Sequence, residues 1–191
     1  SDKEIDMFNM DGRTIIDALQ ANDINPDTIG TVILSHLHFD HAAGITLLPN
    51  ATVIVQEQEW EDANKNRSTM SRTYLPRVLD SIRDHVQLAQ GNCTVLEDIQ
   101  LTVRKGHTWG LQSVEFNDEV GTVCFCSDVM PTCNHVGLAY SMGYDMLPWD
   151  NAQTKCQFLE QAHSEKWRVV LYHEPDTPIV TVLKDQQNRF E

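Results

Sequence analysis

Short apolar runs, each bounded by turn residues, mark the strands that this chain is expected to form. The run Thr31-Val32-Ile33-Leu34 is β-branched and has the length of a fully buried strand. Further apolar or alternating runs predict strands at 52–55, 94–97, 99–104, 112–116, 122–126, 169–171 and 179–183.

Helices are expected between these strands, at three places. Asp11 can cap a helix over 12–22, a polar helix follows at 56–64, and Asp150 can cap a helix that runs through 166. Because strands and helices are interspersed along the chain, the order predicts an α/β fold built of layers.

Length and composition point to an ordinary globular protein. A chain of 191 residues predicts a single domain over 1–191, and 41% apolar with 22% charged residues is a typical globular balance. The chain has no apolar run of about 18 residues, so no transmembrane helix and no membrane partner are expected. The net charge of -14 disfavours nucleic acid as a partner, because phosphate repels an acidic surface.

The cysteines give a weaker indication of the compartment. Their number, five, is odd and their spacing fits no disulfide framework, which predicts reduced thiols and a cytoplasmic location. Cys124 and Cys126 share one face of an expected strand and are interpreted as buried thiols.

The strongest chemical signal is a polar segment that directly follows the first strand, His36-Leu37-His38-Phe39-Asp40-His41. In extended backbone, His36 and His38 project to the same side, so both imidazoles can reach one cation at about 2.0–2.1 Å. Asp40 and His41 follow where the chain must turn, and they can point toward a second cation. Four metal-competent residues in six positions indicate a metal site.

This segment resembles the H-x-H-x-D-H signature of the metallo-β-lactamase superfamily. Three later segments resemble the other landmarks of that family, in family order and each at the end of an expected strand: Gly106-His107-Thr108-Trp109-Gly110, Ser127-Asp128-Val129 and Tyr172-His173-Glu174-Pro175. The resemblance implies a four-layer αββα sandwich with the site at one edge, between the two sheets. Two positions depart from the usual pattern, Ser127 in place of Gly and Trp109 in place of Pro.

The resemblance also implies a dinuclear metal centre. The first metal would be held by His36, His38 and His107, the second by Asp40, His41 and His173, and Asp128 would bridge the two. Zinc is the default metal, and nitrogen and oxygen ligands without a thiolate also admit iron or manganese. Asp40 and Asp128 are the expected catalytic carboxylates, and candidates for substrate contacts are His135, Tyr74 and Tyr144.

The leading functional hypothesis is a dinuclear metal-dependent hydrolase that uses a metal-bound hydroxide on an ester, lactone, thioester or similar bond of a small-molecule substrate. Asp128 favours the lactonase-like and related branches, because lactamases proper carry Cys at this position or lack the bridging carboxylate. Two alternatives stay open: an iron-dependent redox enzyme on the same scaffold, similar to persulfide dioxygenases, and a truncated metal-binding domain without turnover. The resemblance begins near residue 12, where members normally already have strands, so the sandwich is expected to be N-terminally short. Its uncovered sheet edge could then pair with a second copy of the chain.

Overall fold

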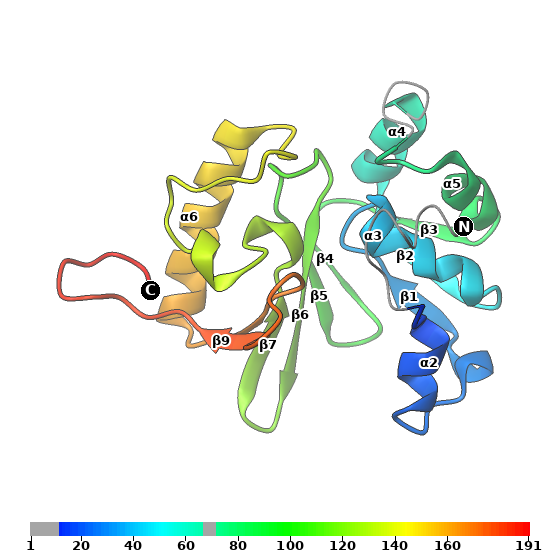
Figure 1. The fold of residues 1–191 in the computed structure, drawn as a ribbon, viewed down its shortest axis with the longest axis horizontal. Coiled ribbons are helices and arrows are strands. Elements are labelled where there is room, and N and C mark those ends of the chain that lie inside the picture. Colours follow the sequence, from blue (N-terminus) through cyan, green and yellow to red (C-terminus); the bar gives the residue numbers. More distant parts are fainter. Residues whose placement is uncertain (1–11, 67–71) are drawn as a thin grey trace.

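The computed structural model describes residues 12–66 and 72–191, and its strands form two sheets (Figure 1). The first sheet is parallel throughout and has the order β1 (Thr31–Ile33), β2 (Thr52–Gln56), β3 (Val86–Ala89). The second sheet has six strands in sequence order: β4 (Cys93–Val95), β5 (Ile99–Val103), β6 (Gln112–Asp118), β7 (Gly121–Phe125), β8 (Arg168–Val170) and β9 (Ile179–Thr181). Its strands are antiparallel to their neighbours except for β7 and β8, which are parallel.

Helices cover the outer faces of both sheets. The first half of the chain contributes α2 (Ile15–Gln20), η1 (Pro26–Thr28), α3 (Phe39–Ala42), η2 (Ala43–Leu47), α4 (Glu57–Asn66) and α5 (Pro76–Ile82). The second half contributes the short turns η3 (Ser127–Val129) and η4 (Cys133–His135) and the long helix α6 (Pro148–Ser164). In Figure 1, α6 lies on one side of the six-stranded sheet, and the helices of the first half lie beyond the three-stranded sheet. No helix in the described ranges is long and apolar enough to cross a membrane.

Three apolar cores separate these layers and confirm the expected αββα sandwich. One core packs α5, through Val78 and Leu79, against the first sheet. A second contains Phe158 and Leu159 of α6, packed on the far face of the second sheet. The third, smaller core lies between the two sheets and includes Leu101. Within the described residues the first sheet has three strands.

Strand β2 shows how the sequence produces two buried faces. Val53 and Val55 belong to the core on the helical side, whereas Ile54, between them, belongs to the core between the sheets. Alternate side chains of a strand point to opposite faces, so a strand covered on both sides needs a continuous apolar run. This is why the run at 52–55 could be assigned as a strand from sequence.

Several expected boundaries are wrong for local reasons. The first described helix begins at Ile15, because Thr14 forms a capping box with Asp17; the expected cap, Asp11, lies outside the described residues. Helix α6 begins at Pro148 instead of after Asp150, since proline fits the first helical position. Strand β4 ends at Val95, before two residues with positive φ angles, 48° and 70°.

Candidate metal centre

The structure brings together the seven side chains that the sequence suggested as metal ligands. They come from the segment after β1, the β5–β6 turn, η3 after β7, and the segment after β8, and they are His36, His38, Asp40, His41, His107, Asp128 and His173. Three groups have ligand atoms within 4.8 Å of one another: His36–His38–His107, His36–His41–Asp128 and Asp40–His41–His173. The first and last of these are the two trios that the resemblance implied.

Asp128 lies at the centre of the cluster and is only 2% exposed. Its Oδ2 atom is 3.1 Å from His107 Nε2 and 3.4 Å from His41 Nε2. Its Oδ1 atom is 3.4 Å from His173 Nε2. One carboxylate therefore faces histidines of both trios, which is the position that a bridging ligand requires.

The donor atoms of this cluster fit divalent metal ions. The buried side-chain atoms that have no hydrogen-bond partner among the described residues include His36 Nε2, His41 Nε2 and Asp128 Oδ1. An unpartnered buried polar atom costs about 1–3 kcal/mol, so such atoms rarely cluster without a reason. A bound cation would satisfy all three, and imidazole nitrogens with carboxylate oxygens are a ligand set that suits zinc.

The electrostatics favour the metal-binding form at three of these positions, His36, His38 and Asp128. Burial lowers the pKa of His38 to about 3 and also lowers the pKa of His36, which keeps both imidazoles neutral. Burial opposes ionisation of Asp128, yet the imidazoles of His107, His173 and His41 close to its carboxylate hold its pKa well below the usual range. At His107 burial lowers the pKa, but Asp128 and Asp145 outweigh it and raise the pKa to about 9. A metal ion bound at His107 would therefore have to displace a proton at neutral pH.

Two histidines of the first trio are held from behind by buried polar side chains. Asp145 Oδ1 lies 2.9 Å from His107 Nδ1, on the side of the ring away from Asp128. Ser35 Oγ lies 3.2 Å from His36 Nδ1 and accepts a hydrogen bond from Ser127 Oγ at 2.9 Å. Such contacts fix the orientation of a metal-binding ring and leave its other nitrogen for the metal. Sequence analysis did not find these supporting roles, because hydrogen bonds of this kind have no pattern along the chain.

The departure at Ser127 has a structural explanation. Its φ angle is +50°, in the left-handed region that glycine adopts at no steric cost, which accounts for the glycine usual at this position. Serine accepts this backbone strain and gains the hydrogen bond to Ser35.

The turn that carries His107 is held between two helices. A Cβ atom at Gly106 would lie 2.3 Å from Asn151 Cα of α6. A Cβ atom at Gly110 would lie 2.3 Å from the backbone nitrogen of Glu59 in α4. Real Cβ atoms do not approach this closely, so both glycines are required for the turn to lie against α4 and α6.

One side of the cluster is open to solvent. The side chains of Asp40 and His173 are both 36% exposed, whereas His36, His107 and Asp128 are almost fully buried. Tyr172, which sequence analysis missed, lies on this open side and donates a hydrogen bond to the Asp40 carbonyl at 2.7 Å. Its place at the cluster could have been suspected from the sequence, because it directly precedes His173, a proposed ligand.

The three candidates for substrate contacts have different environments. Tyr74 is fully buried and its hydroxyl donates to Glu59, so it does not line an open pocket; this corrects the expectation from sequence. Tyr144 is 79% exposed on the surface. His135 is half-buried, with Nδ1 2.8 Å from the Thr132 hydroxyl, and buried Lys155 fixes its loop by donating to the His135 carbonyl.

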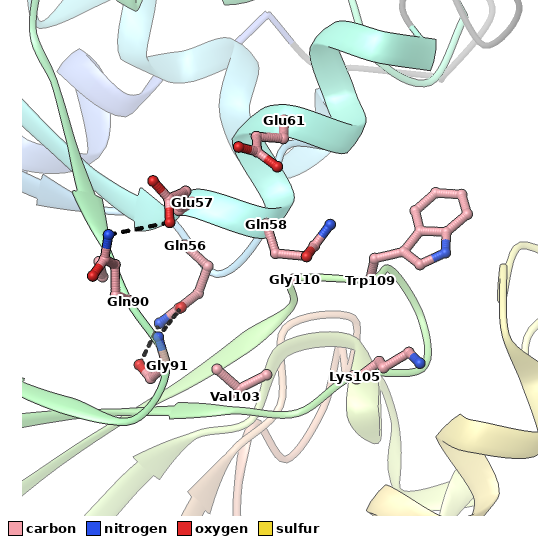
Figure 2. A pocket seen from close by; sticks show the side chains of 11 residues that line it. Gln56, Glu57, Gln58, Glu61, Gln90, Gly91, Val103, Lys105, Trp109 and Gly110 are labelled. Carbon is pink, nitrogen blue, oxygen red and sulfur yellow. Dashed lines mark hydrogen bonds between the residues drawn. The ribbon is translucent and has the colours of Figure 1, made fainter.

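A pocket of about 540 Å³ is lined by residues of α4, of the segment after β3 and of the His107 turn (Figure 2). Figure 2 shows Gly110 of the His107 turn next to the first turn of α4, and Trp109 beside it at the edge of this pocket. None of the seven clustered side chains lines it as far as the described residues go. The open side near Asp40 and His173 is therefore the more direct route to the cluster.

Comparison with known proteins agrees with this geometry. The sequence model of the Metallo-beta-lactamase superfamily matches residues 5–173. An N-acyl homoserine lactonase of Bacillus thuringiensis is 32% identical over 105 residues, which are 55% of this chain and 40% of that protein, so the match spans less than half of the relative.

Two solved structures share the fold. A probable metal-dependent hydrolase from Staphylococcus aureus superposes with a TM-score of 0.89 at 22% identity, covering 100% of this chain and 71% of that chain. AidC, a dizinc quorum-quenching lactonase in complex with a product, superposes with a TM-score of 0.82 at 18% identity, covering 95% and 70%.

Proposed function

Because the chain belongs to the metallo-β-lactamase superfamily, we propose that it acts as a metal-dependent hydrolase and that the cluster around Asp128 is its active site. The observation that carries this proposal is the group of unpartnered buried ligand atoms, which includes His36 Nε2, His41 Nε2 and Asp128 Oδ1. The lactonase relative and the S. aureus hydrolase support it at the level of the reaction type.

The proposed ligand assignment follows the two trios. His36, His38 and His107 would hold one ion, Asp40, His41 and His173 the other, and Asp128 would contact both. Divalent ions held by these residues, which we propose to be zinc, would supply a lowered pKa for bound water, toward 7, and polarisation of a substrate carbonyl.

The protein's own residues would then position the substrate. Asp40 and His173 are the partly exposed members of the cluster, so a substrate would approach from their side. Tyr172 holds the backbone of Asp40 and stacks near His41, with ring centroids 4.2 Å apart, which fixes this rim. His135 Nδ1 is engaged by Thr132, so Nε2 is the nitrogen available to hydrogen-bond a substrate oxygen.

For the substrate we propose a small lactone or ester, with N-acyl homoserine lactones as the first compounds to assay, since curated relatives act on them. Both ring opening of a lactone and ester hydrolysis need attack at one carbonyl and release of an alkoxide, and the two trios on either side of Asp128 suit that chemistry.

The test combines metal content with turnover. Protein purified without chelator should contain about two equivalents of metal by elemental mass spectrometry, and it should hydrolyse at least one lactone or ester. Asp128→Ala should lose about one equivalent and at least about a thousandfold of activity, because Asp128 faces both trios. Asp150→Ala, which removes an exposed carboxylate, is the control and should match the wild type.

Two outcomes would reject the proposal: failure of the wild type to take up zinc, iron or manganese on titration, or full activity of Asp128→Ala. Iron as the resident metal, together with oxygen consumption, would favour the redox alternative over hydrolysis.

A further inference from the structure

Glu59, in the first turn of α4, is a fully buried carboxylate that lies outside the metal cluster. Burying an ionised carboxylate is costly unless hydrogen bonds compensate it, so such a group needs an explanation. Nothing in the sequence marked this residue, because a polar helix with three glutamates normally exposes all of them. Here two of the three, Glu57 and Glu61, remain at least partly exposed.

The partners of Glu59 provide that explanation. Its Oε1 accepts a hydrogen bond from the Leu37 backbone at 2.9 Å, and Leu37 lies between His36 and His38. Its Oε2 accepts a hydrogen bond from Thr108 Oγ1 at 2.6 Å, and Thr108 directly follows His107. One carboxylate therefore joins the two segments that supply the first trio.

Two further donors complete the arrangement. The Tyr74 hydroxyl donates to Oε1 at 3.4 Å, and the Gly110 backbone donates to Oε2 at 3.3 Å. Each oxygen thus accepts from two neutral donors. A carboxylate is the side chain that matches this environment, because the NH₂ group of a glutamine would face donors in place of acceptors.

The backbone approach at Gly110 makes this link short and rigid. The first turn of α4 lies directly beside Gly110, as Figure 2 shows, and a Cβ atom at that glycine would collide with the Glu59 backbone at 2.3 Å. Any displacement of the His107 turn must therefore break the contacts of Glu59, displace α4, or do both.

We propose that Glu59 is a positioning residue that sets the spacing between the His36–His38 segment and the His107 turn, and so the metal affinity of the first trio. This inference rests on the proposed metal centre. It adds that a carboxylate touching none of the ligands determines how well three of them converge. The second trio, which Glu59 does not contact, should depend on it much less.

The test is to measure the two metal affinities separately. Glu59→Gln and the control Glu61→Gln remove the same charge from the same helix, and only the first removes the buried link. Zn²⁺ affinity is measured by competition with a chromophoric chelator, and Co²⁺ absorption reports the coordination geometry. Glu59→Gln should weaken the binding step that belongs to the first trio by about 10–100-fold and leave the affinity of the other step within about threefold. Glu61→Gln should match the wild type in both steps.

A second variant covers the case in which Glu59→Gln does not fold. Thr108→Val keeps the shape of the side chain and removes only one of the two hydrogen bonds to Oε2, so it should weaken the same binding step by a smaller factor. His107→Ala identifies which step belongs to the first trio.

The possible outcomes are distinguishable. If the wild type binds no metal, the proposed function fails. If the wild type binds two ions and both Glu59→Gln and Thr108→Val bind them with unchanged affinity, the positioning role is wrong. Equal weakening of both binding steps would also overturn the positioning role, because it would indicate a general loss of stability that affects both trios.

Discussion

Replacing Ser127 offers a direct test of how the backbone beside Asp128 is held. Ser127 is fully buried, has a φ angle of +50° and donates a hydrogen bond to Ser35, which contacts His36. Two substitutions separate the backbone from the hydroxyl. Ser127→Ala removes the hydroxyl and keeps the strained backbone, whereas Ser127→Gly removes the hydroxyl and relieves the strain.

The expected magnitudes follow from these contacts. Loss of the hydrogen bond costs both variants about 1 kcal/mol of unfolding free energy. The left-handed conformation costs a residue with a Cβ atom about 1–2 kcal/mol, and glycine avoids this cost. Glycine loses about 0.4–1 kcal/mol through the greater freedom of its unfolded chain. Ser127→Gly should therefore be more stable than Ser127→Ala by about 1 kcal/mol.

The sign of this difference is the informative part, since glycine is normally the less stable of the two. The assay is urea denaturation of metal-free protein, followed by circular dichroism. Ser81, on the exposed side of α5 with ordinary helical backbone, is the matched position, and there alanine should exceed glycine by about 1 kcal/mol. If Ser127→Ala exceeded Ser127→Gly in stability by the same margin as at Ser81, the left-handed backbone at this position would be refuted.

Two further predictions concern charged groups. Asp145→Asn should lower Zn²⁺ affinity about 10–100-fold, measured by chelator competition, because an amide supports the His107 ring less well than a carboxylate. The control Asp150→Asn changes an exposed carboxylate and should alter the affinity less than twofold. Equal effects of the two variants would contradict the role of Asp145. The Asp118 carboxyl should titrate with a pKa of about 2 by NMR, because Arg168 hydrogen-bonds it, and its midpoint should return toward 3.8 in Arg168→Gln. Because this pKa is lowered on folding, the stability that the pair contributes is complete above about pH 4 and disappears as the pH falls through 2. An unchanged midpoint in that variant would rule out the ion pair as the cause.

The layered fold could be predicted from sequence because burial on two faces leaves a clear pattern. The continuous apolar run of β2 is required by a strand that is covered on both sides. Boundaries were less predictable, because they depend on single backbone angles. The positive φ angles of Leu96 and Glu97 end β4 early, and the sequence does not predict them because leucine and glutamate seldom adopt positive φ.

The cluster of metal-competent residues could also be anticipated, for a different physical reason. Metal ligands must be chemically specific, and four residues that can serve as ligands lie within six positions, so the composition of that segment alone is unusual. The resemblance then supplied the remaining candidate ligands by their order along the chain. Tyr74 shows the limit of this approach, because a tyrosine near a site looks the same in sequence whether its hydroxyl faces a substrate or a buried carboxylate.

The residues that hold the cluster were not predictable, and the reason lies in how they act. Glu59 and Asp145 are each far in sequence from the histidines that they support, because Glu59 comes from α4 and Asp145 from the loop that precedes α6. Any helix or loop that approaches closely enough can supply such a carboxylate, so no spacing rule identifies it. What the structure does reveal is a division of the site: the buried side is held by carboxylates and glycines that tolerate little change, and the side of Asp40 and His173 is open. If the proposed function holds, substitutions on the open side should alter substrate choice without disturbing the spacing of the candidate ligands, whereas substitutions behind His36 and His107 should alter metal affinity first.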